Sequence, residues 1–133
     1  MYKRQVFAAA GVQQDLSRTP FSSQGPVKWN TEHYQEGRVD KPEVCAFNYK
    51  IPSLHPSGGS PKQTVNGNSF AGPMYCGTIA LMLSANPELK PWETRWIIQE
   101  TARDVADKGY DYQTGQGLID AYRAVKRAQA SRR

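Results

Sequence analysis

The chain has 133 residues, enough for one domain or for part of a larger one, and its net charge is +5. The basic excess is spread out, at 8 against 5 acidic residues in residues 1–62 and 9 against 7 in residues 88–133, and forms no basic stripe of the kind that binds nucleic acid. The apolar runs are too short to span a bilayer, so neither a nucleic-acid nor a membrane partner is expected.

The N-terminus weakly resembles a secretory signal. Lys3 and Arg4 precede an apolar run at residues 6–10, but this run is at the lower limit of length for a signal. We interpret residues 6–12 instead as a short strand of continuous apolar type, as found inside a parallel sheet that is covered on both faces. The sequence contains no convincing signal peptide, and the localisation stays unassigned.

Glycine and proline are concentrated before residue 92 and predict many turns there. We predict a compact loop at residues 21–26, an exposed polar insertion at residues 27–40 and a mobile loop at residues 48–63, the last two being surface loops. A second strand is predicted at residues 41–47. Pro42 stands near its start, where a missing backbone N–H is tolerated.

The two cysteines, Cys45 and Cys76, match no metal-ligand spacing and cannot form a disulfide framework. We expect both to be small buried apolar side chains.

A segment without charge, from Gln63 to Pro87, occupies the middle of a chain in which 22% of residues are charged. Such a segment is usually buried, and we predict a helix in it from near Ser69 to about Ala85, with Pro73 close to the first turn. The free N–H groups and the positive dipole end of this helix would favour an anion beside Ser69. Ser69 is therefore a candidate nucleophile, although a core helix without chemistry explains the composition as well.

Two further helices are predicted in the last third of the chain. Pro91 opens the first, which ends at Lys108 and Gly109, and Trp92 and Trp96 are expected to pack at its edge. Gly115, Gln116 and Gly117 make a tight approach to the second, which runs from Leu118 to about Ala130. The expected inward-facing residues are Ile97, Ile98, Thr101, Ala102 and Val105 in the first helix, and Leu118, Ala121, Tyr122, Val125 and Ala128 in the second.

The nucleophile elbow of the α/β-hydrolases does not fit Ser69. That motif has glycine where Ala71 stands, and its histidine follows the serine. The only histidines of this chain, His33 and His55, both precede Ser69.

The surroundings of Ser69 instead resemble those of the catalytic serine in the subtilisin-like serine peptidases, which read Gly-Thr-Ser-Met/Phe-Ala-Ala/Ser-Pro and then Gly four residues on. Four other segments match the family in the same order: the Phe-Ser-Ser loop, the Lys-Pro-Asp-Val-x-Ala strand, the helix end and the closing Gly-x-Gly-Leu-Ile-Asp-Ala. The matching residues are Gly67, Ser69, Phe70, Ala71, Pro73 and Gly77 at the serine, and residues 21–26, 41–46, 83–87 and 115–121 elsewhere.

The resemblance covers residues 6–128 and implies an α/β fold. It identifies residues 1–133 as the C-terminal part of a subtilisin-like catalytic domain, with a parallel sheet of few strands, a buried central helix and two further helices. In this family the triad follows the order Asp, His, Ser, and an Asn between His and Ser donates to the oxyanion. The Asp, His and Asn of the family all lie upstream of the region matched here, so we expect the chain to be a fragment of a longer parent.

By this resemblance the parent is a serine endopeptidase in which Ser69 is the nucleophile, and the fragment alone is inactive. The backbone N–H of Ser69 is one oxyanion donor, and Asn68 and Gly67 support the nucleophile loop. The expected partners are a polypeptide substrate and the upstream part of the same domain. No cofactor is expected; calcium is possible in the full-length parent, but no site is identified here. The alternative is a catalytically silent subtilisin-like domain that binds peptides or serves as a structural module.

The chain departs from the family pattern at several positions. Asn68 replaces the usual Thr, and Phe47 and Asn48 stand where Pro-Gly is common. Tyr75 and Cys76 replace small aliphatic residues and predict a repacked core. Gly72 stands in place of Ala or Ser.

A triad within this chain would use Asp15, His33 and Ser69, which occur in the right order. However, nothing like the His-Gly-Thr-His context of the family surrounds His33. His55 lies in the glycine- and proline-rich loop and is interpreted as a solvated residue.

Overall fold

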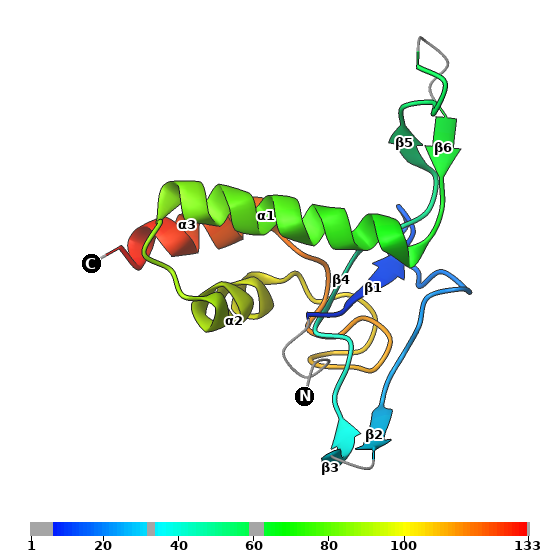
Figure 1. The fold of residues 1–133 in the computed structure, drawn as a ribbon, viewed down its shortest axis with the longest axis horizontal. Coiled ribbons are helices and arrows are strands. Elements are labelled where there is room, and N and C mark those ends of the chain that lie inside the picture. Colours follow the sequence, from blue (N-terminus) through cyan, green and yellow to red (C-terminus); the bar gives the residue numbers. More distant parts are fainter. Residues whose placement is uncertain (1–6, 32–33, 59–62, 133) are drawn as a thin grey trace.

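The computed structural model describes residues 7–31, 34–58 and 63–132 (Figure 1). Its longest element is the helix α1 (Ala71–Ala85), which packs against α3 (Ala121–Ala130). The helix α2 (Pro91–Thr101) also packs against α3. The chain is thus a mixed α/β structure with helices at the predicted places, and the predicted fold class is confirmed.

A small parallel sheet lies beside the first half of α1. It pairs β1 (Ala9–Val12) with β4 (Val44–Phe47), so that Ala10 lies opposite Cys45. Both strands were predicted, although Val6 of the first prediction lies outside the described residues. Their burial on both faces explains the continuous apolar sequence.

The segment around Leu118 extends this sheet. Cys45 N–H donates to Gly117 O at 2.8 Å, and Leu118 and Arg103 exchange two backbone hydrogen bonds of 2.8 Å each. The prediction of helix at Leu118 is therefore wrong, and so is the extension of α2 to Lys108. Arg103 and Leu118 are extended because they pair with each other, and residues 106–109 form a bend.

Two antiparallel hairpins occupy the regions predicted as loops. One pairs β2 (Val27–Thr31) with β3 (Tyr34–Val39), and the other pairs β5 (Ile51–Ser53) with β6 (Gln63–Val65). In Figure 1 the β5–β6 hairpin projects near the N-terminal end of α1, and the β2–β3 hairpin projects at the foot of the molecule. In β2, Val27 and Trp29 alternate with Lys28 and Asn30, a strand signal that the prediction of a loop missed. The strands β5 and β6 have three residues each and are too short to show such a pattern.

The main core lies between β4 and the helices. Met82 of α1 is fully buried there, and Ala124 takes the inward position on α3, while the predicted Tyr122 is 72% exposed. Cys45 is buried as expected, in a second cluster between the sheet and Val105, whereas Cys76 is exposed. The buried residues of the main core are Val44, Met82, Leu89, Ile97, Ile98, Ala124 and Ala128.

The other side of α1 is open to solvent in this chain. Only Ala71, Thr78 and Met82 of the helix are buried, while Leu81 is 56% and Leu83 is 38% exposed. The uncharged segment is therefore covered on one side rather than on all sides. Within the described ranges, no helix combines the length and apolar character needed to cross a membrane.

Candidate active site

Ser69 lies in a short 3₁₀ helix, η1 (Asn68–Phe70), that leads directly into α1. Gly67 precedes it with a φ of 142°, a conformation that residues with a side chain rarely adopt. The Ala71 N–H donates to Asn68 O, which joins the 3₁₀ turn to α1. The predicted helix start near Ser69 thus agrees with the structure, and the Ser69 side chain is exposed.

The electrostatic setting of Ser69 favours negative charge. Backbone N–H groups in the first turn of a helix have no partner inside it, and the dipole places its positive end there. Neither η1 nor α1 carries an acidic residue in its first turn that would oppose this effect.

Asn48 connects the end of β4 to the residues just before Ser69. Its side-chain Nδ2 donates to Asn68 Oδ1 at 2.7 Å and to Thr19 Oγ1 at 3.0 Å. Its backbone carbonyl accepts from Gly67 N–H at 2.9 Å, and its N–H donates to Val12 O at 3.1 Å. The loop before Ser69 is therefore attached to the parallel sheet through one residue.

The sheet is shaped to accept the Asn48 side chain. A Cβ on Gly11 would overlap the Asn48 carboxamide, so this position of β1 has room only for glycine. The Phe-Ser-Ser loop supports the same place, because Ser22 Oγ accepts from Gly11 N–H at 2.8 Å. Thr19 N–H also donates to Gly11 O, at 3.2 Å.

Asn48 is fully buried, and its Oδ1 has no hydrogen-bond partner among the described residues. An unsatisfied buried acceptor of this kind typically costs about 1–3 kcal/mol. Sequence reasoning noted Asn48 only as a departure from Pro-Gly and assigned it no role. The available signal was its place just after a buried parallel strand, since sites in such sheets form at the carboxyl ends of the strands.

The other candidates for a triad within this chain are not brought to Ser69. Ser69 Oγ forms no hydrogen bond with any residue that the structure describes. Asp15 is exposed and accepts from the Ser17 hydroxyl at 2.6 Å and from its N–H at 3.0 Å, which lowers the pKa of Asp15. His55 Nδ1 accepts from Ser57 N–H at 3.3 Å, and His33 lies outside the described residues.

Tyr75 and Cys76, which replace small aliphatic residues of the family pattern on α1, are accommodated in different ways. The Tyr75 ring stacks on Phe7 with centroids 3.8 Å apart, and it contacts the main core, so its size is accommodated by packing. Burial raises the pKa of the Tyr75 hydroxyl. Cys76 is exposed and requires no repacking, so that part of the prediction is wrong.

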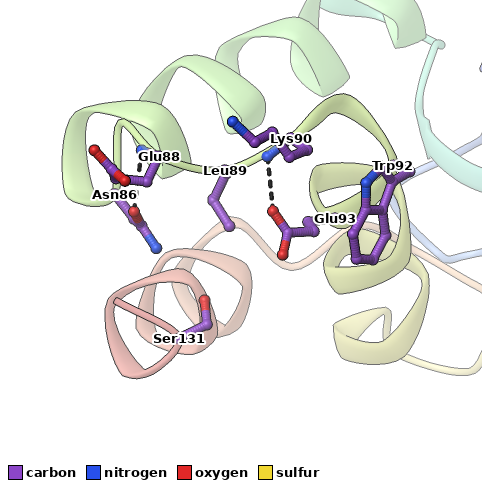
Figure 2. Close-up of a pocket in the computed structure, with 7 residues that line it drawn as sticks. All are labelled: Asn86, Glu88, Leu89, Lys90, Trp92, Glu93 and Ser131. Atoms are coloured by element: carbon purple, nitrogen blue, oxygen red, sulfur yellow. Dashed lines mark hydrogen bonds between the residues drawn. The ribbon is translucent and has the colours of Figure 1, made fainter. Parts of the chain in front are cut away.

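A pocket of about 280 Å³ lies at the opposite end of α1, where the α1–α2 turn meets the end of α3 (Figure 2). Two of its polar side chains accept hydrogen bonds from the nearby backbone: Lys90 N–H donates to Glu93 Oε2 at 2.8 Å and Glu88 N–H donates to Asn86 Oδ1 at 3.2 Å. Across the described part of the chain, no group of three or more His, Cys, Asp or Glu side chains could hold a metal ion.

Known proteins similar to this chain carry the same fold. The model of the subtilase family matches residues 2–117. A probable subtilase-type serine protease of Deinococcus radiodurans is 38% identical over 77 residues, which are 56% of this chain and 11% of that protein. The chain thus spans about a tenth of the length of this curated relative.

Two solved structures superpose on most of the chain. MycP1 with the N-terminal propeptide removed gives a TM-score of 0.70 at 26% identity, over 90% of this chain and 36% of that one. Fervidolysin from Fervidobacterium pennivorans gives a TM-score of 0.74 at 24% identity, over 94% of this chain and 20% of that one, a likeness of fold. With the family model matching most of its length, the chain belongs to the subtilase family.

Proposed function

We propose that this chain carries the nucleophile of a serine endopeptidase and that Ser69 is that nucleophile. Its Oγ attacks the carbonyl carbon of a peptide bond in a polypeptide substrate and gives a tetrahedral intermediate. The C–N bond then breaks, the amine leaves with the proton that the base took from Ser69, and an acyl-enzyme remains, which water hydrolyses to the acid and free Ser69. The observation that carries this proposal is the position of Ser69, exposed in the first turn before α1 on a loop attached to the sheet. Membership of the subtilase family supports it.

The Ser69 N–H is proposed as a donor to the oxyanion, with Gly67 and Asn68 supporting the loop. This N–H lies in the first turn, where backbone donors have no partner inside the helix and the dipole favours developing negative charge. The reaction in this form requires no cofactor. Calcium in a longer parent is a further possibility, for which no site is assigned among the described residues.

The base and the acid that orients it are proposed to come from an upstream part of the same catalytic domain. The exposed apolar side of α1, with Leu81 and Leu83, supports this proposal, because it is the kind of surface that another part of a domain covers. A serine hydroxyl without a base is a weak nucleophile at neutral pH. The 133-residue chain alone is therefore expected not to hydrolyse peptides at a useful rate.

A fluorophosphonate probe tests the nucleophile in the full-length gene product. We expect labelling of the native protein, none of Ser69→Ala, and native labelling of Ser84→Ala, a control that removes an exposed serine of α1 whose hydroxyl donates to Ala80 O. Equal labelling of the native protein and Ser69→Ala would refute the assignment.

The coding sequence upstream provides a second test, because it should contain the Asp, the His-Gly-Thr-His segment and the oxyanion Asn. Their absence from an intact gene, together with an unlabelled native protein, would leave the alternative function, a catalytically silent domain that binds peptides or serves as a structural module.

A further inference from the structure

We infer that Asn48 is a positioning residue for Ser69 and acts through Asn68. The inference rests on the proposed function of Ser69. Asn48 does not touch the reacting atoms; it holds the carboxamide of the residue just before the nucleophile.

The contacts of Asn48 converge on the two residues that precede Ser69. Its carbonyl accepts from Gly67 N–H and its side chain donates to Asn68 Oδ1, so both are held from one point on the sheet. Two bonds fix Asn48 itself, one to Val12 O and one to Thr19 Oγ1. A displacement of Asn48 would therefore be transmitted directly to the loop that carries Ser69.

The Asn48–Asn68 bond also fixes which way the Asn68 carboxamide is turned. Because its oxygen accepts from Asn48, its amide nitrogen is the end left for other contacts. Asn68 is only partly buried, and it is adjacent to the residue whose N–H is the proposed oxyanion donor. An amide that turned freely would present its oxygen to the developing negative charge for part of the time.

The burial of Asn48 indicates that this asparagine has a role beyond stabilising the fold. The carboxamide is fully buried over Gly11, yet its Oδ1 has no partner among the described residues. An unsatisfied acceptor does not favour folding, so stability alone does not account for asparagine here. Asn48 and Asn68 are moreover two separate departures from the family pattern, and they bond to each other 20 positions apart.

The test compares the rate of fluorophosphonate labelling in full-length Asn48→Gly, Asn68→Ala and the double variant with that in the native protein. All rates are measured at a temperature well below the melting midpoint of each protein. Asn48→Gly restores the residue common in the family and adds no bulk at the site. We expect each single change to slow the covalent step by roughly 10- to 100-fold and to leave probe binding unchanged, since a small misplacement of a reacting group lowers the reaction rate by factors of this size. The double variant should be no slower than the slower single variant.

Asn66→Ala is the matched control. Asn66 lies two residues from Asn68, and its Oδ1 accepts a hydrogen bond from a backbone group, Lys50 N–H at 2.6 Å, rather than from Asn48, so its loss should leave labelling within about twofold of native. Losses in Asn48→Gly and Asn68→Ala that multiply in the double variant, or a native covalent rate in Asn48→Gly, would overturn the inference.

Hydrogen exchange separates this inference from the proposed function. In Asn48→Gly, the hydrogen-bonded amides of Gly67, Phe70 and Ala71 should exchange at least about tenfold faster than in the native protein, whereas Asn66→Ala should leave them unchanged. If the native protein and Ser69→Ala label equally, the proposed function fails, and the exchange result alone decides whether Asn48 holds the loop. Unchanged exchange in Asn48→Gly would refute the positioning role.

Discussion

The geometry around Ser69 depends on residues that are distant in the sequence. The motif around the serine locates the loop and the helix that follows it, because Gly67 and Pro73 restrict where a helix can begin. The role of Asn48 could not be predicted in the same way. Its contact with Asn68 exists only because β4 ends opposite Val12 of β1 and the Asn48 side chain then lies over Gly11, an arrangement that depends on the register of the sheet.

The two cysteines should differ strongly in reactivity. In the 133-residue chain, Cys76 is exposed and should react quickly with a thiol reagent, while Cys45 is fully buried and should react only on unfolding. The measurement is a timed thiol titration in native buffer and in denaturant. Cys76→Ser should abolish the fast reaction, and a second fast thiol in the native chain would contradict the burial of Cys45.

Cys45 also predicts a pH dependence of stability. Burial, with a contribution from Asp111, raises the pKa of the Cys45 thiol from 9.0 to about 12. The folded state therefore holds this proton more tightly than the unfolded state. The contribution of the protonated thiol to the free energy of unfolding is complete below pH 9.0 and is lost as the pH rises toward about 12. The measurement is urea unfolding of the native chain and of Cys45→Ala between these two pH values. The free energy of unfolding should fall more steeply with pH in the native chain than in the variant.

The helices show which patterns in the sequence are informative. Both ends of α1 were predicted, since Pro73 and the Asn86-Pro87 pair act locally on the backbone. The inward face of α3 was predicted correctly at Val125 and Ala128 but with Tyr122 in place of Ala124, because the spacing of apolar residues does not show where the edge of the buried stripe lies. Close packing of α1 against α3 instead selects the small residue.

Truncation of two neighbouring residues of α1 should destabilise the chain to very different degrees. Met82 is fully buried in the main core, so Met82→Ala should lower the free energy of unfolding of the 133-residue chain by about 2–5 kcal/mol. Leu81 is 56% exposed, and Leu81→Ala should change it by less than about 1 kcal/mol. Urea unfolding of both variants provides the measurement, and equal losses would contradict the one-sided burial of α1.

Taken together, the described parts expose apolar side chains on several elements. Leu81 and Leu83 are exposed on α1, Trp92 and Trp96 on α2, and Tyr122 on α3. Arg127 covers part of Trp96, with its guanidinium 5.1 Å from the ring centroid. Isolated exposed residues are common in soluble proteins, but a contiguous apolar surface favours association.

The isolated 133-residue chain is accordingly expected to self-associate. Light scattering should show a mean mass that rises with protein concentration, and Leu81→Lys combined with Leu83→Lys should reduce this rise without lowering the thermal midpoint by more than a few degrees. A chain that stays monodisperse at all concentrations would contradict this prediction and the proposed upstream partner.

The fit of Asn48 over Gly11 has a consequence for the order in which these two positions can change in evolution. An alanine methyl group at position 11 would occupy the space of the Asn48 carboxamide. Asparagine can therefore enter position 48 only in a lineage that already has glycine at position 11, and that glycine is then retained for as long as the asparagine remains. The two sites should show directional epistasis in any set of relatives, with asparagine at position 48 found only together with glycine at position 11.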